Sequence, residues 1–181
     1  MKKFNTTALA QAAVLLAICI ISQFFKNLSV YITGPIINAC IIVCVLTAGM
    51  GWAIALSIIT PVTSYFITGS PIMAAIPLIM PCIMVGNAIL AVCVGLLKDK
   101  LKFKFGLPVS MVIGSVLKAI FMGVVISLII VPNMLPEKMA KMMPTIQKTF
   151  SITQLITALI GSVIAYIIWI PLKTMLKNIG E

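Results

Sequence analysis

One lysine of this chain stands far inside a long apolar segment. Lys118 follows Val109, where that segment begins, by nine residues. On a helix that rises about 1.5 Å per residue it therefore lies about 14 Å from the start, near the middle of a membrane. Its ammonium group cannot reach either surface from there, so we expect it to face the interior of a helix bundle, where it needs carbonyl groups, water or an anion, or must be in its neutral form.

No carboxylate is placed to neutralise Lys118. The chain has three acidic residues. Asp99 and Glu137 lie in polar connections, and Glu181 is the last residue. Counting therefore excludes an internal ion pair, and two roles remain for the lysine: contact with a bound ligand, directly or through water, or a structural role at backbone carbonyls.

Other polar side chains occur at similar depths in the apolar segments. Asn87 lies near the middle of its segment. The amides of Gln23, Asn38 and Gln154 lie nearer to the ends of theirs. Each alone is more often a hydrogen bond between helices, worth about 0.6 kcal/mol, than a ligand contact. Their shared depth predicts a polar path that opens outward. The candidate substrate-binding residues are Lys118, Asn87, Asn38, Gln154, Gln23 and the outer aromatic Tyr31.

The chain lacks the groups on which most catalytic and ion-coupled sites depend. It has no histidine and no acid within its apolar segments, so it offers no obvious proton relay, hard-cation site or histidine-activated nucleophile. Its five cysteines lack zinc spacing and are interpreted as packing residues. The remaining enzymatic alternative is a serine activated by a lysine, Ser115 with Lys118, but nothing else resembles an oxyanion site. We expect no catalytic residue, no metal and no cofactor.

The elements that hold these residues are predicted to be membrane helices. The chain has 181 residues, of which 62% are hydrophobic and 9% are charged, whereas soluble domains have about 25% charged residues. Six spans of about 20 residues would use about 120 residues, so one integral membrane domain over residues 1–181 accounts for the whole chain. The expected apolar segments are about 8–25, 35–48, 51–67, 76–97, 109–131 and 151–172.

The distribution of lysines orients the spans. An all-α bundle of six helices with both termini cytoplasmic puts more lysines inside than outside, in agreement with the positive-inside bias. The inside set is Lys2, Lys3, Lys98, Lys100, Lys102, Lys104, Lys173 and Lys177, and the outside set is Lys26, Lys138, Lys141 and Lys148. Joining the second and third segments into one helix would reverse this bias. The first segment is interpreted as a retained span, because its apolar run is longer than the h-region of about 7 to 15 residues in a cleavable signal peptide. The net charge of +10 is interpreted as a topology signal and a match to anionic lipids, with no nucleic acid as partner.

Two further features concern access and association. The longest outer connection, 132–150, mixes prolines, methionines and lysines. It is either an ordinary amphipathic connector or a flexible lid over a ligand site.

The first segment contains two patterns of alanines four residues apart, Ala8 with Ala12 and Ala13 with Ala17. This spacing lets another helix approach closely.

Taken together, these features resemble the S component of an energy-coupling factor (ECF) transporter, the membrane subunit that captures vitamins in bacteria. The resemblance rests on the alanine patterns, the six-helix layout and, in order, four short motifs. These are Gly34-Pro35-Ile36-Ile37-Asn38-Ala39, Gly86-Asn87, Leu117-Lys118-Ala119, and the run from Phe150 to Gly161. The resemblance covers nearly the whole chain.

The resemblance implies a substrate-binding subunit in the bacterial cell membrane that performs no ATP chemistry itself. Such subunits bind substrate in an outward-facing pocket, associate with a transmembrane coupling subunit and two ATPases, and are thought to topple in the membrane. The alanines Ala8, Ala12, Ala13 and Ala17 would then form the docking face. A lysine without an internal acid favours an anionic vitamin such as pantothenate. The alternative is an independent small secondary transporter or channel, against which the lack of a coupling-ion site counts.

Overall fold

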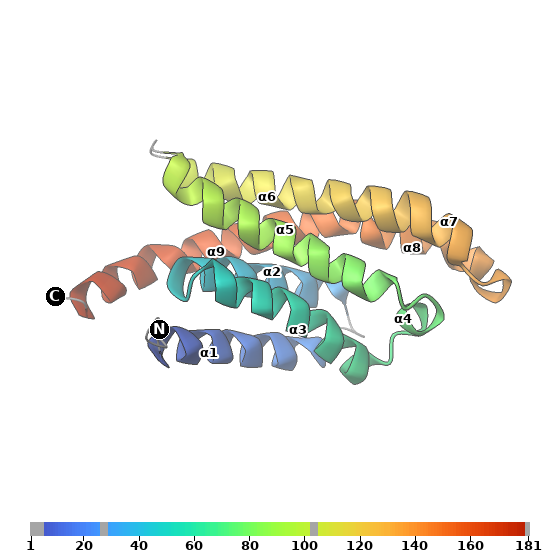
Figure 1. Cartoon of the computed structure of the whole chain (residues 1–181), viewed down its shortest axis with the longest axis horizontal. Helices are drawn as coiled ribbons and strands as arrows, with labels where there is room; N and C mark the ends of the chain where they lie inside the picture. Colours follow the sequence, from blue (N-terminus) through green and yellow to red (C-terminus); the bar gives the residue numbers. More distant parts are fainter. Residues whose placement is uncertain (1–5, 26–28, 102–104, 180–181) are drawn as a thin grey trace.

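The computed structural model describes residues 6–25, 29–101 and 105–179. Figure 1 shows that this part of the chain is a bundle of helices. Its elements are α1 Thr6–Gln23, α2 Val30–Thr47, α3 Met50–Thr68, α4 Pro71–Ala75, α5 Ile79–Lys100, α6 Gly106–Met122, the π-helix η1 Gly123–Ile130, α7 Val131–Met134, the 3₁₀-helix η2 Glu137–Met142, α8 Met143–Phe150 and α9 Ile152–Ile179.

Six helical segments are long and apolar enough to cross a membrane, which confirms the predicted number of spans. They are Thr6–Gln23, Val30–Thr47, Met50–Thr68, Ile79–Lys100, Gly106–Met134 and Glu137–Lys177. The prediction that the second span begins near residue 35 is wrong, because α2 begins at Val30. Ser29 caps that helix by accepting a bond from the Tyr31 N–H at 3.1 Å, and Pro35 lies inside it.

Helix α2 occupies the centre of the bundle, with α1, α3, α5 and α9 packed around it. Helices α5 and α6 lie side by side, and α1 lies at the opposite edge of the molecule (Figure 1). Close approach of α2 and α9 depends on small residues. A Cβ atom added at Gly34 would lie 2.9 Å from Thr157, and one added at Gly161 would lie 2.7 Å from the Asn38 Cβ.

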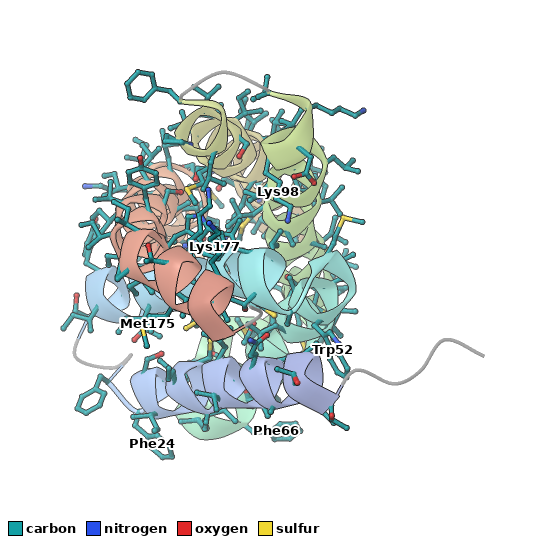
Figure 2. The ribbon with its side chains drawn as sticks, turned by 90° about the vertical axis from the view of Figure 1, so that its left-hand side faces the viewer. Phe24, Trp52, Phe66, Lys98, Met175 and Lys177 are labelled. Atoms are coloured by element: carbon teal, nitrogen blue, oxygen red, sulfur yellow. The ribbon has the colours of Figure 1, made fainter. Side chains whose placement is uncertain are left out.

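The two ends of the bundle differ. At one end, here called the termini end, α1 begins and α9 finishes; at the other, the short-helix end, lie α4, α7 and α8 (Figure 1). Figure 2 looks at the molecule from the termini end, where Lys98 of α5 and Lys177 of α9 lie. Lys138, Lys141 and Lys148 belong to η2 and α8 at the short-helix end. Other lysines of the topology prediction, Lys2, Lys3, Lys26, Lys102 and Lys104, fall outside the described residues.

Candidate functional site

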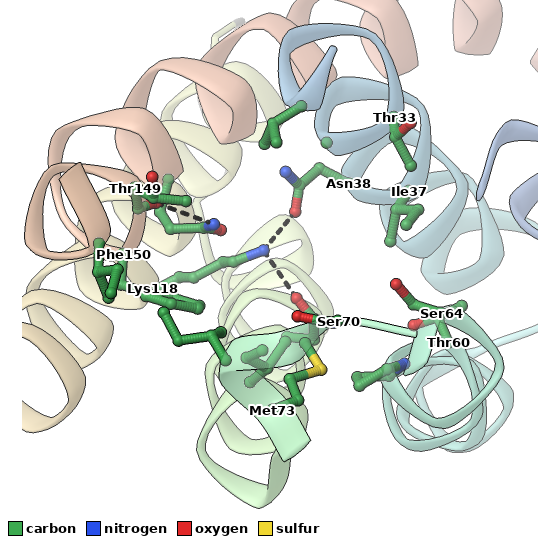
Figure 3. Close-up of a pocket in the computed structure, with 18 of the residues that line it drawn as sticks. Thr33, Ile37, Asn38, Thr60, Ser64, Ser70, Met73, Lys118, Thr149 and Phe150 are labelled. Carbon is green, nitrogen blue, oxygen red and sulfur yellow. Dashed lines mark hydrogen bonds between the residues drawn. The ribbon is translucent and has the colours of Figure 1, made fainter. Parts of the chain in front are cut away.

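A cavity of about 310 Å³ opens within the short-helix end. Its walls come from α2, α3, α4, α5, α6, α8 and α9 (Figure 3). Elements from the first half of the chain and the last therefore meet around one space. Its lining includes hydroxyl groups from α3 and α8, such as those of Thr60 and Thr149, beside apolar side chains such as Ile37, Met73 and Phe150.

Lys118 lies at the inner wall of this cavity and is only 3% exposed. Its Nζ atom donates to Asn38 Oδ1 at 2.5 Å and to Asn87 Oδ1 at 2.7 Å (Figure 3). These bonds join α2, α5 and α6 at one point. They engage two of the three donors of an ammonium group, so a third donor remains for a ligand or for water.

The hydrogen-bond partners of Lys118 carry no charge. Both of its partners are amide oxygens, and no aspartate or glutamate is among the described residues that line the cavity. Amide oxygens satisfy the hydrogen-bonding needs of an ammonium group but leave its net charge in place. An anion entering the cavity would therefore meet an uncompensated positive charge in an environment of low dielectric, where electrostatic attraction is strong.

Two glycines allow the partners of Lys118 to reach it. Gly161 on α9 lies against Asn38, and a Cβ atom there would also lie 2.7 Å from the Pro35 carbonyl oxygen. Gly86 on α5 lies against Met122 of α6, whose Cγ atom would be 2.8 Å from an added Cβ. Gly161 therefore sets how closely α9 approaches α2 beside Asn38, and Gly86 sets how closely α5 approaches α6 beside Asn87.

Four of the six residues predicted to bind substrate line the cavity, namely Lys118, Asn87, Asn38 and Gln154. Gln154 also donates through Nε2 to the Thr149 carbonyl oxygen at 3.3 Å. All four were found in the sequence as polar groups in apolar segments. Whether they contact a substrate stays a prediction.

Gln23 and Tyr31 lie elsewhere. Gln23 is fully buried and donates through Nε2 to the Thr60 carbonyl oxygen at 3.0 Å, so it joins α1 to α3 behind the cavity wall. Tyr31 is 49% exposed, and its hydroxyl lies 3.4 Å from Thr153 Oγ1 beside a shallow outer depression that Lys148 also lines. The depth of a residue along a helix can be read from the sequence, but the direction of its side chain around the helix depends on packing.

Several lining residues were not singled out in the sequence. Thr33 of α2 and Thr60 of α3 are threonines inside apolar spans, a signal too common to separate them from packing residues. Met73 reaches the cavity from the five-residue helix α4, and Thr149 and Phe150 reach it from α8. The connection 132–150, for which the sequence left a connector and a lid open, thus contributes part of the cavity wall.

The serine next to the buried lysine is engaged elsewhere. Ser115 Oγ lies 2.8 Å from the Met111 carbonyl oxygen and 3.0 Å from Ser162 Oγ. The Lys118 ammonium points to Asn38 and Asn87 (Figure 3). The geometry therefore does not pair the two groups as a nucleophile and its base. Among the described residues there is also no cluster of side chains suited to a metal ion.

The two alanine patterns of α1 face different ways. Ala8 and Ala12 are each 6% exposed and pack inside the bundle, whereas Ala13 and Ala17 lie on the exposed side of the helix. Positions five residues apart differ by about 140° around a helix, so the two patterns cannot share one face. The expected docking stripe is corrected accordingly: Ala8 and Ala12 belong to internal packing, and Ala13 and Ala17 remain available on the surface.

Comparison with known proteins gives one match. A family model described as "ECF transporter, substrate-specific component" matches residues 7–173, which is most of the chain. Neither a curated protein nor a solved structure matches.

Proposed function

Because the chain belongs to the family of substrate-specific components of ECF transporters, we propose that it captures a small anionic vitamin, such as pantothenate, from outside a bacterial cell. The chain is a multi-pass membrane protein and a transport subunit. The substrate would bind in the cavity at the short-helix end. It would then pass inward through a transmembrane coupling subunit and two ATPases, which would carry out all ATP hydrolysis.

The observation that carries the choice of an anion is the uncompensated charge at Lys118. Its two hydrogen-bond partners are neutral amides. A carboxylate bound there would form a charge-assisted hydrogen bond, which is about twice as strong as a bond between neutral groups. A cationic vitamin would meet repulsion from the lysine and would find no acidic side chain among the described lining residues.

Cavity size and lining narrow the substrate further. An apolar cavity of about 150 Å³ holds one benzene molecule, so the observed volume of about 310 Å³ suits a ligand of about 12 non-hydrogen atoms by the same measure. Phe150 is the one aromatic side chain among the described lining residues. A large flat ring would therefore lack a second ring to stack on, whereas a flexible chain with hydroxyl and amide groups matches the threonines and serines of the wall.

The exposed face of α1 is the proposed docking surface for the coupling subunit. Small side chains at Ala13 and Ala17 lie there beside Val14, which is 61% exposed. Small residues let two membrane helices approach closely enough for van der Waals contact along their length. The orientation of the bundle, with the cavity outward, rests on the predicted excess of lysines at the termini end.

Native mass spectrometry of the chain purified alone in a mild detergent tests the binding function. We expect a retained small molecule whose mass is that of pantothenate, or an adduct formed after pantothenate is added. The adduct should be lost in Lys118→Met and kept in Lys100→Met, a matched control at the exposed end of α5. Retention of a cationic vitamin, or an adduct that survives Lys118→Met, would contradict the proposal.

Uptake in cells that contain the coupling module tests the docking surface. Ala13→Trp should reduce uptake at least about tenfold while binding of pantothenate is unchanged, because a bulky side chain would hold the two helices apart. Ala12→Trp should instead reduce the amount of folded protein, because Ala12 is buried. Normal uptake by Ala13→Trp would remove this face from the proposal.

A further inference from the structure

Helix α8 forms one wall of the cavity although it is only eight residues long. Thr145, Ile146, Thr149 and Phe150 of this helix line the space. A helix of two turns is not stable by itself in isolation. Its position over the cavity must therefore be fixed by contacts with neighbouring elements.

Two reciprocal hydrogen bonds join α8 to the π-helix η1. Ser127 Oγ donates to the Gln147 carbonyl oxygen at 2.9 Å, and Gln147 Nε2 donates to the Ser127 carbonyl oxygen at 2.9 Å. We call these two bonds the Ser127–Gln147 pair. Neither residue lines the cavity, so the pair acts on α8 from the side facing away from a ligand.

The backbone of η1 explains why Ser127 has a carbonyl group free to accept. In the π register the N–H of Val131 bonds to the Ile126 carbonyl oxygen, five residues earlier. The next residue, Pro132, would serve the Ser127 carbonyl in the same way, but proline has no N–H. Ser127 is 2% exposed, so water has little access to this carbonyl, and the Gln147 side chain supplies the missing donor.

The end of α8 also carries a local bond at the same residue. The Gln147 carbonyl oxygen also accepts a bond from Ser151 Oγ at 2.6 Å. Apolar packing adds to this, since Ile146 and Phe150 belong to a cluster with Ile126 and Ile130 of η1. The pair of hydrogen bonds adds a directional contact, which depends on one position of the two groups along the helix.

From this geometry we infer that Gln147 is a positioning residue for the binding site: the Ser127–Gln147 pair holds α8 over the cavity and thereby sets how long a ligand stays bound. The inference rests on the proposed function, because it concerns the retention of the same ligand. Gln147 does not touch the ligand. Removing its side-chain donor should therefore raise the dissociation rate of the ligand and leave the contacts of the ligand with Lys118 nearly unchanged.

The test measures association and dissociation rates of radiolabelled pantothenate with the full chain in lipid nanodiscs. Gln147→Met keeps the length of the side chain and removes its donor. We expect dissociation to become about tenfold faster and association to change less than about threefold, the usual division of such effects.

Asn133→Leu is the matched control. Asn133 Nδ2 donates to the Ile129 carbonyl oxygen at 2.7 Å, so it is also an amide bound to a carbonyl of η1, but it does not reach α8. Dissociation from this variant should be unchanged. Equal acceleration in Asn133→Leu and Gln147→Met, or an unchanged dissociation rate in Gln147→Met, would overturn the inference.

A second measurement separates this inference from the proposed function. If the unmodified chain binds no pantothenate, the proposed substrate is wrong, and hydrogen exchange of the backbone amides of residues 143–150 tests the pair directly. We expect exchange there to be about tenfold faster in Gln147→Met, with the amides of α9 after residue 158 unchanged. Unchanged exchange in residues 143–150 would overturn the holding role.

Discussion

The halves of the bundle toward its two ends are built from the same long helices but are held together differently. Toward the termini end, fully buried apolar side chains such as Ile42, Leu90 and Val94 fill the space between helices. Toward the short-helix end, a second apolar cluster that includes Ile126 and Ile146 packs beside a cavity, and the helices around it are also joined by hydrogen bonds. The half toward the termini end is therefore close-packed, and the half toward the short-helix end contains the cavity.

Several bonds at the short-helix end run from a side chain to a carbonyl of another helix. Thr33 donates to the Ser22 carbonyl oxygen at 3.0 Å, and Gln23 donates to that of Thr60 at the same distance. Such bonds fix the spacing between two helices but do not fill the space between them with side chains. From this comparison we predict that Lys118 and its amide partners contribute mainly to binding and the apolar side chains toward the termini end mainly to stability, a division that substitutions can test.

Of these substitutions, Ile42→Ala should have the largest effect. It should lower stability and leave the affinity for the ligand nearly unchanged. Ile42 is fully buried on α2, one turn from Asn38 toward the termini end. Large-to-small substitutions at such sites cost about 3 kcal/mol through lost packing contacts. Thermal unfolding in detergent should show this loss while affinity for pantothenate changes less than about threefold. A comparable loss of affinity would mean that the two halves are coupled.

Lys118→Met should lower affinity and should also lower stability, because the lysine is a buried donor. The substitution removes the charge and leaves the side-chain oxygens of Asn38 and Asn87 without their donor. We expect affinity, measured by titration, to fall at least about tenfold, which corresponds to about 1.4 kcal/mol. Affinity close to that of the unmodified chain would show that the lysine has a structural role only.

Gly161→Ala should affect both properties, because Gly161 lies where α9 approaches Asn38. The added Cβ would be 2.7 Å from both the Asn38 Cβ and the Pro35 carbonyl oxygen, so α2 and α9 must separate. We expect a loss of about 1 kcal/mol in stability and roughly threefold in affinity. Gly51→Ala is the control, since no atom in the described part of the chain lies within 4 Å of its added Cβ. Equal effects of the two substitutions would contradict the importance of this crossing.

Thr60→Val should give the smallest change. Thr60 is 1% exposed, and its Oγ1 atom has no hydrogen-bond partner among the described residues. Replacing an unsatisfied buried hydroxyl by a methyl group of similar shape should raise stability by about 1 kcal/mol and leave affinity unchanged. A drop in affinity would instead identify this hydroxyl, at the wall of the cavity, as a ligand contact.

Much of the site could be predicted because polar groups are rare in the apolar segments. Lys118 stood out by its depth, and Asn38, Asn87 and Gln154 by their amides; all four line the cavity. The prediction placed Gln23 and Tyr31 with them because it used depth alone. It also placed Ala12 on the same face as Ala13, although the structure buries only the first of the two.

The sequence alone determined the membrane setting, the number of spans and the depth of each polar residue. These follow from composition and from the fixed rise per residue of a helix, which act along the chain. Only the tertiary structure decided which side of each helix faces the cavity, that Lys118 bonds to two amides, and that α8 forms a wall held at Ser127. The rotation of a helix about its axis is set by packing against neighbours that are distant in the chain, so local sequence does not specify it.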